Sequence, residues 1–203
     1  MQSWRATPVN SREEQTVEIN GYTVPPCSCV IHFYYTRQEQ QRLLGFLLEG
    51  ISRREGVVLA SNQESYDTLR DGMEMLGVRS AAHQITLVEI TPDLRASIGN
   101  IGSAAAHVLA RNHGYRGRVL ADFGSMVGQD MIFELEGLLN ATLSGMDLVS
   151  VTQYDGRGFA APITIEQFQT HALAIVGNAF FRENKHYTPP EAYYRKRAAG
   201  GRR

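Results

Sequence analysis

The sequence predicts an α/β fold, a three-layer sandwich in which helices cover both faces of a mainly parallel sheet. Short apolar runs rich in Val, Ile, Phe and Tyr alternate with longer segments in which apolar residues recur at three- and four-residue spacing. Glycine and proline mark the boundaries between these segments. Strands that are separated by helices form right-handed crossovers, and the resulting sheet is parallel and buried on both faces.

The first strand and helix are predicted in the N-terminal third of the chain. Residues 1–26 are polar and end in a proline pair, which predicts a flexible arm or an edge element. A strand follows over residues 29–35. The turn TRQEQ after it begins a helix, because Thr36 and Glu39 have the spacing of a capping box. The buried stripe of this helix consists of Leu44, Leu47, Leu48 and Ile51, and Gly56 can end it.

The same strand-and-helix unit recurs along the chain. Further strands are expected over residues 57–60, 85–90, 118–123 and 148–154. The capping spacing recurs at Ser61 and Glu64, and Pro92 opens the following helix. A short helix over residues 164–171 leads to the apolar run ALAIVGNAFF, which predicts one late strand. The basic tail, residues 195–203, is expected to be a solvated terminus, with contact to nucleic acid as the alternative.

Composition indicates one globular domain. The chain has 203 residues, of which 43% are hydrophobic and 20% are charged. The formal net charge of -1 gives no overall attraction to nucleic acid or to anionic membranes. We expect a cytoplasmic protein without a membrane partner, because no apolar run approaches the roughly 18 residues that span a bilayer. The two cysteines are too few for a disulfide framework or a four-ligand zinc site.

Most familiar catalytic motifs are missing. The two lysines, Lys185 and Lys196, do not follow glycines, so the phosphate loop G-x-x-x-x-G-K-[ST] does not occur. Arg37 in the TRQEQ turn could attract an anion, but Glu39 competes for the same helix N-terminus. The histidines have no metal-ligand spacing, and G-x-S-x-G does not occur. ATP hydrolysis, a metal and a cofactor are therefore not predicted.

Ligands of parallel sheets bind outside the carboxyl ends of the strands, so the side chains just after each strand form the candidate site. These side chains are aromatic, amide, hydroxyl and acidic groups, among them Tyr34, Asn62, Asp122 and Gln153. Helix capping is the alternative role of the smaller polar residues. His32 lies within the first strand and is typical of a half-buried, hydrogen-bonded histidine.

Three stretches resemble the MEDS family of DcmR-like sensory domains, which occur in methanogen and methylotroph regulators. They are VIHFYYTRQEQQRLLGFLLEGISRREGVVLASNQES, the later VTQYD, and THALAIVGNAFFRENKHYTPPEAYY. The resemblance covers residues 27–194, which are therefore expected to form a sensory domain. It implies a RecA-like or KaiC-like sheet with a degenerate phosphate loop, and a core that senses small molecules.

On this resemblance the TRQEQ turn is a former nucleotide site, and the strand ends line a largely apolar pocket with a few placed polar groups. The residues predicted to contact the ligand are His32, Tyr34, Tyr35, Thr36, Asn62, Gln63, Asp122, Gln153 and Tyr154. The implied function is a non-catalytic regulatory domain in signal transduction or transcription regulation. It would bind an unidentified small molecule and signal through a partner protein, with a homodimer as the expected self-association.

Two other functions remain open. In the first, the old site is filled by side chains and the chain is a protein interaction module. In the second, the chain is an enzyme that uses Asp122, Glu134 or His171. An open pocket at the strand ends would favour the sensor over the interaction module, and convergent groups with shifted pKa values would favour the enzyme.

Overall fold

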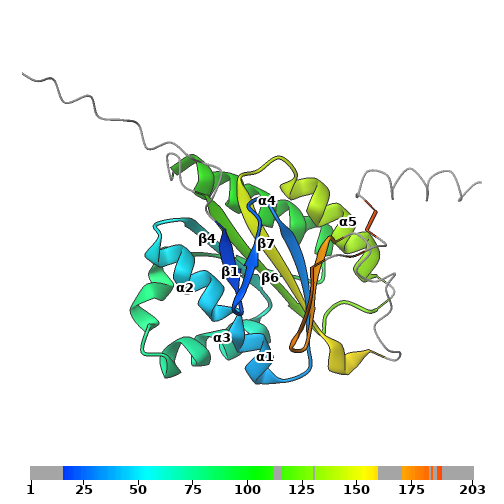
Figure 1. Cartoon of the computed structure of the whole chain (residues 1–203), viewed down its shortest axis with the longest axis horizontal. Coiled ribbons are helices and arrows are strands. Elements are labelled where there is room, and N and C mark those ends of the chain that lie inside the picture. Colours follow the sequence, from blue (N-terminus) through cyan, green and yellow to red (C-terminus); the bar gives the residue numbers. More distant parts are fainter. Residues whose placement is uncertain are drawn as a thin grey trace, which may run out of the picture.

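A central seven-stranded sheet organises the structure, a computed structural model that describes residues 16–111, 116–129, 131–159, 171–182, 184, 187 and 188 (Figure 1). The strand order is β5-β4-β6-β7-β3-β8-β9, and only the pairing of β8 with β9 is antiparallel. The strands are β3 (Cys29–Tyr34), β4 (Gly56–Ser61), β5 (Ile85–Glu89), β6 (Gly117–Gly124), β7 (Leu148–Asp155), β8 (Leu173–Val176) and β9 (Ala179–Phe181). The predicted α/β fold with a mainly parallel sheet is confirmed.

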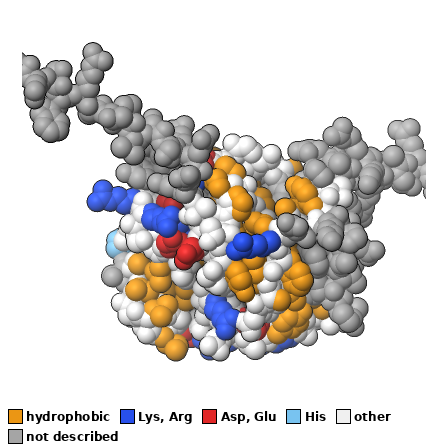
Figure 2. Space-filling view, viewed as in Figure 1, with side chains coloured by type: hydrophobic (Ala, Val, Ile, Leu, Met, Phe, Trp, Pro, Cys, Tyr) orange, Lys and Arg blue, Asp and Glu red, His pale blue; other side chains and the backbone are white. Residues whose placement is uncertain are grey.

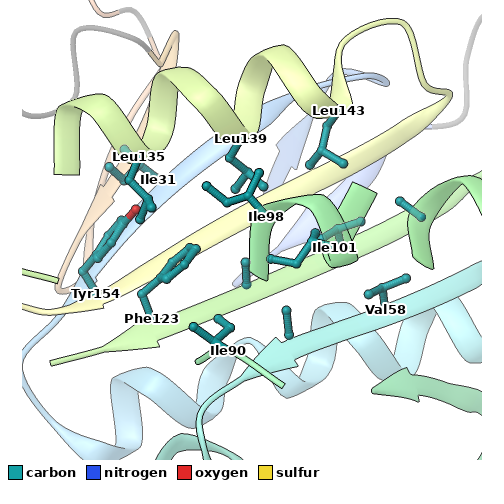
Figure 3. Packing of buried hydrophobic residues seen from close by; sticks show 14 of the residues in the cluster. Ile31, Val58, Ile90, Ile98, Ile101, Phe123, Leu135, Leu139, Leu143 and Tyr154 are labelled. Atoms are coloured by element: carbon teal, nitrogen blue, oxygen red, sulfur yellow. The ribbon is translucent and has the colours of Figure 1, made fainter. Parts of the chain in front are cut away.

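Helices cover both faces of the sheet. One face packs against α1 (Arg37–Arg42), α2 (Leu44–Ser52) and α3 (Gln63–Met75), and we call it the α1–α3 face. The other packs against α4 (Leu94–Arg111) and α5 (Ile132–Leu143), and we call it the α4–α5 face (Figure 3). Side chains alternate between the faces, so Leu59 enters the first core and Val58 the second. Both faces of the central strands are therefore buried.

A hairpin at the start of the described chain corrects the expectation of a flexible arm over residues 1–26. β1 (Val17–Ile19) pairs with β2 (Tyr22–Val24) across an Asn20-Gly21 turn in which both residues have positive φ. Asn-Gly is the preferred sequence of such a turn. The three valine and isoleucine side chains of the hairpin, Val17, Ile19 and Val24, are buried against the α1–α3 face. Residues 1–15 lie outside the described part.

Three further elements differ from the prediction. The helix after the first strand is divided into α1 and α2 at Leu43. The helix after β5 begins at Leu94 rather than Pro92, because the Asp93 side chain accepts a hydrogen bond from the Ala96 amide at 3.0 Å. The run ALAIVGNAFF forms the two strands of a hairpin, with a turn at Gly177. The predicted helix over residues 164–171, apart from His171, and the tail over 195–203 lie outside the described residues.

The connections open a crevice at the carboxyl edge of the sheet. The chain leaves β4 for α3 on one face, whereas it leaves β6 for α5 on the opposite face. β4 and β6 are hydrogen-bonded neighbours, so their continuations diverge above the edge. Such divergence is where parallel sheets usually bind ligands. In the part of the chain that the structure describes, no helix is long and apolar enough to cross a membrane.

Candidate ligand-binding site

A row of polar side chains crosses the carboxyl edge of the sheet on the α1–α3 face. The parallel register pairs His32 with Gln153, Gln153 with Asp122, and Asp122 with Ser61. All of these residues are buried. Since they occupy equivalent positions on four neighbouring strands, their side chains point to the same face and can contact one another.

Asp122 is the centre of a buried hydrogen-bond network. Its Oδ2 accepts from Gln40 Nε2 and from Gln153 Nε2, each at 2.7 Å, and its Oδ1 accepts from the Gly124 amide at 2.9 Å. The Ser65 hydroxyl also hydrogen-bonds this carboxyl group. We call these five residues the Asp122 network. Burial raises the pKa of Asp122 to about 6, and the hydrogen bonds oppose that shift.

His32, a residue of β3, extends the Asp122 network by one further hydrogen bond. Its Nδ1 lies 3.2 Å from Gln153 Oε1. Because the amide nitrogen of Gln153 donates to Asp122, its oxygen is the acceptor, and Nδ1 of His32 carries the proton. Burial lowers the pKa of His32 to about 4, so the imidazole is neutral at pH 7. Its Nε2 is buried and has no hydrogen-bond partner within the described ranges.

A cavity of about 200 Å³ lies above the Asp122 network, and we call it the carboxyl-edge cavity. Its walls are Tyr34, Arg37, Gln40, Glu64, Ser65, Thr68, Gly124, Ser125, Asp155 and Arg157. This lining is mainly hydroxyl, amide and charged groups, which differs from the largely apolar pocket that the resemblance implies. The side chains of Gln40 and Ser65 reach both the cavity and Asp122, so the network holds two walls of the cavity in place.

The two arginines on the walls of the carboxyl-edge cavity are already paired with carboxylates. Arg37 pairs with Asp71 of α3 at 2.6 Å, and Arg157 binds both carboxylate oxygens of Asp155 at 2.8 and 2.6 Å. Burial acts to raise the pKa of Asp155, but the hydrogen bonds and charge of Arg157 outweigh it and lower that pKa. The cavity therefore suits a small polar molecule with both donor and acceptor groups better than a strongly charged anion.

The TRQEQ turn is occupied by its own side chains. Thr36 Oγ1 accepts from the Glu39 amide at 3.1 Å, and Glu39 Oε2 accepts from the Tyr35 amide at 2.8 Å. A carboxylate therefore stands at the helix N-terminus, where a phosphate would otherwise bind. At the next strand the predicted cap is wrong by one residue, because Ser61 ends β4 and Asn62 accepts from the Ser65 amide at 2.8 Å.

The predicted site residues separate into distinct groups. Tyr34 lines the carboxyl-edge cavity. Three others, His32, Asp122 and Gln153, lie behind it in buried hydrogen bonds. Thr36 and Asn62 cap helices, as the alternative interpretation of small polar residues expected. Gln63 is exposed and bonds Asp67 at 3.1 Å, and the Tyr35 ring packs against Gly156, where an added Cβ would lie 2.6 Å from it.

Tyr154 points away from the predicted site. It follows Gln153 in the strand, so its side chain lies on the α4–α5 face, where its ring stacks on Phe123 (Figure 3). The Tyr154 hydroxyl donates to Glu136 Oε1 at 2.5 Å, and Glu136 Oε2 lies 3.0 Å from His171 Nε2. All three side chains are buried. Neighbouring residues of β7 thus belong to two separate polar networks on opposite faces.

Replacement of Tyr154 by phenylalanine is expected to lower the free energy of unfolding by about 1–3 kcal/mol, because the buried Glu136 carboxyl group loses its hydrogen-bond donor. Chemical denaturation measures this difference. Tyr34→Phe is the matched control, since it removes the same hydroxyl group from the cavity wall. An equal loss of stability in the two variants would contradict a specific contribution from the bond between Tyr154 and Glu136.

Sequence reasoning missed Gln40 and Ser65, although a signal was present for both. Gln40 stands one turn before the buried leucines Leu43, Leu44 and Leu47. Ser65 precedes Leu69 at four-residue spacing on the buried side of α3. A polar side chain in the apolar stripe of a helix needs a buried partner. That partner is Asp122 in both cases.

Known proteins give no assignment for this site. No protein-family model matches the chain, and no curated protein matches it. Within the described ranges, no group of three or more His, Cys, Asp or Glu side chains is arranged to hold a metal ion. The functional interpretation therefore depends on the Asp122 network, the carboxyl-edge cavity and the family resemblance.

Proposed function

We propose that the chain is a non-catalytic sensory domain that binds a small polar molecule in the carboxyl-edge cavity and signals through a partner protein. The observation that carries this proposal is the buried Asp122 network beneath the cavity. Four donors fix the carboxylate, and two of them, Gln40 and Ser65, also form walls of the cavity. Walls that are held before the ligand arrives reduce the entropic cost of binding.

The dimensions of the cavity restrict the ligand. A volume of about 200 Å³ is below the roughly 300–1,000 Å³ typical of pockets for drug-sized molecules. The hydroxyl groups of Tyr34, Ser65 and Thr68 offer both donors and acceptors, and the charged walls include both signs. A compact molecule with several hydrogen-bonding groups, neutral or zwitterionic, fits this combination.

Binding is better supported than catalysis. The shifted pKa of Asp122 is the kind of signal that accompanies general acid–base chemistry. Both oxygens of this carboxyl group are, however, engaged by protein donors, and the side chain is fully buried behind the cavity wall. A base must be within hydrogen-bond reach of the substrate proton that it removes. The geometry therefore favours a positioning role for Asp122.

The resemblance to the MEDS family supports the same proposal. A mostly parallel sheet with helices on both faces is compatible with the RecA-like core that the resemblance implies. Glu39 supplies a physical reason for a degenerate phosphate loop, since its carboxylate takes the place of an anion at the N-terminus of α1. We infer that the ancestral nucleotide site became a site for a different small molecule.

Ligand binding can be transmitted from the cavity to the rest of the domain through the ion pairs of its charged walls. Arg37 links α1 to α3 by its ion pair with Asp71, and a ligand that competes for Arg37 would loosen this link. Beyond it, Met75 and Leu76 at the end of α3 have exposed fractions of 82% and 59%, and Leu87 on the edge strand β5 is also exposed. Figure 2 shows hydrophobic side chains gathered at the lower left of the view, where Figure 1 draws α2 and α3. We propose that the partner protein docks on this surface.

Native mass spectrometry of the purified protein tests the proposal, followed by denaturing mass spectrometry to identify any released molecule. We expect a small polar molecule bound at one per chain. Tyr34→Phe should reduce the bound fraction about tenfold, since it removes a hydrogen-bonding group from the cavity wall. Tyr154→Phe is the control, because the Tyr154 hydroxyl lies on the opposite face of the sheet.

Two results would contradict the sensor. A wild-type protein without a bound molecule, together with no binding in a subsequent screen of small polar metabolites, would favour the interaction module. Equal occupancy in wild type, Tyr34→Phe and Tyr154→Phe would show that the molecule binds outside the carboxyl-edge cavity.

A further inference from the structure

A second cavity opens at the opposite, amino-terminal edge of the sheet, and we call it the amino-edge cavity. Its volume is about 490 Å³. The end of α2, the first residues of β4 and β5 and the last turns of α4 form its walls. This cavity shares no residue with the carboxyl-edge cavity, so what it binds is independent of the proposed function.

Basic side chains converge on the amino-edge cavity from three elements. Arg54 follows α2, and His83 lies in the last turn of the 3-10 helix η1 (Arg79–Gln84) before β5. His107 and Arg111 lie one turn apart on α4. Neither arginine forms an ion pair or a side-chain hydrogen bond with another described residue. The acidic side chain on the wall, Glu55, is paired with the buried Arg118. The cavity therefore has an excess of positive charge that no carboxylate of the described residues neutralises.

Arg54 has an unusual backbone conformation for a residue other than glycine. Its φ is 59°, in the left-handed region. Its amide donates to the Ile51 carbonyl at 3.0 Å and the Glu55 amide donates to the Gly50 carbonyl at 2.9 Å, which is the pattern of a Schellman motif at the end of α2. Glycine is the preferred residue at this position, and an arginine there strains the backbone. The fold thus holds an unpaired guanidinium at the cavity wall at a cost to local conformation.

We propose that the amino-edge cavity binds a small organic molecule that carries a phosphoryl group. Guanidinium groups match phosphate oxygens with two parallel hydrogen bonds, and the imidazoles of His83 and His107 can add further donors. The volume exceeds what a bare phosphate fills and lies within the range of small-molecule sites. Apolar walls at Ile51 and Val108 can contact the organic part of the ligand.

Isothermal titration calorimetry at low ionic strength tests this proposal with two probes, inorganic pyrophosphate and adenosine 5′-monophosphate. Both should bind the wild-type chain at one site. Arg54→Gly and Arg111→Gln should each weaken both affinities by about tenfold or more, because each removes charge-assisted hydrogen bonds to phosphate. Arg54→Gly should unfold at the same denaturant concentration as wild type or at a higher one, since glycine relieves the strained backbone.

Arg95→Gln is the matched control, because Arg95 lies on the same helix as Arg111 but in its first turn, where it pairs with Glu134. Its affinity for both probes should equal that of wild type. The proposal would be overturned if the wild type bound neither probe. It would also be overturned if Arg54→Gly and Arg111→Gln both bound the probes with the same affinity as wild type. Binding of pyrophosphate without binding of the nucleotide would overturn the assignment of an organic ligand.

Discussion

Replacement of Arg118 by methionine is expected to lower the free energy of unfolding by about 3–5 kcal/mol. The Arg118 side chain is fully buried on the α1–α3 face, beneath α2. Its Nη1 donates to Glu49 Oε2 at 2.8 Å and to the Phe46 carbonyl at 2.7 Å, and its Nε pairs with Glu55. Methionine fills a similar volume but leaves the Glu55 carboxylate, whose side chain is 6% exposed, without its cation. A buried charge that loses its partner is among the most destabilising changes in a protein.

Two variants separate this effect from simple loss of packing. Arg53→Met removes the other arginine that contacts Glu49, but Arg53 is 40% exposed, so we expect a loss below about 1 kcal/mol. The double variant Arg118→Met with Glu55→Gln removes the stranded charge and should recover part of the stability. Urea denaturation of all four proteins measures the differences. A loss in Arg118→Met no larger than that in Arg53→Met would show that the buried ion pairs contribute little.

The second large effect is a dependence of stability on pH that originates at Asp122. Burial raises the pKa of this carboxyl group from its ordinary 3.8 to about 6 in the folded chain. Between these two pH values the folded state holds a proton that the unfolded state has released. The free energy of unfolding therefore falls as pH rises, by about 2 kcal/mol from this group alone between pH 4 and pH 6. Above about pH 7 the contribution no longer changes.

Two measurements test the contribution of Asp122. Carbon-detected NMR of aspartate-labelled protein should show one side-chain carboxyl group that titrates near pH 6. The lowered pKa of His32 acts in the opposite direction over the same pH range, so the test is the difference between two proteins. Between pH 4.5 and pH 7, denaturation should show that wild type loses stability relative to Asp122→Asn, which cannot ionise. If all aspartates titrated below pH 5, Asp122 would be an ordinary ionised carboxylate and its hydrogen bonds would outweigh its burial.

The strands and most helices could be predicted because their signals are local. Buried parallel strands are short apolar runs, and β4 (GVVLAS) and β6 (GRVLADFG) are clear examples. The missed hairpins also had local signals, since Asn20-Gly21 and Gly177-Asn178 are typical turn pairs between apolar residues. These signals were outweighed by the polar composition of the arm in one case and by the length of the apolar run in the other.

The candidate site was less predictable because it depends on which face of the sheet each side chain enters. Alternation along β7 separates Gln153 from Tyr154, and the strand order brings Asp122 beside Gln153. Strand order is a property of the whole chain and has no local signal. The helix that contributes Gln40 follows β3. In the sequence β4 and β5 separate β3 from β6, whereas in the sheet only β7 lies between them, which brings Gln40 within reach of Asp122.

The two polar networks on opposite faces of β7 restrict how this domain can move. Gln153 is tied to Asp122 on one face, and Tyr154 is tied to Glu136 on the other. A slide of β7 along its axis would break both bonds at once and would leave buried polar atoms on each side without partners. The centre of the sheet is therefore a fixed platform. We expect any displacement that the proposed ligand causes to occur in the covering helices, as a tilt of α1 or α3 relative to the sheet.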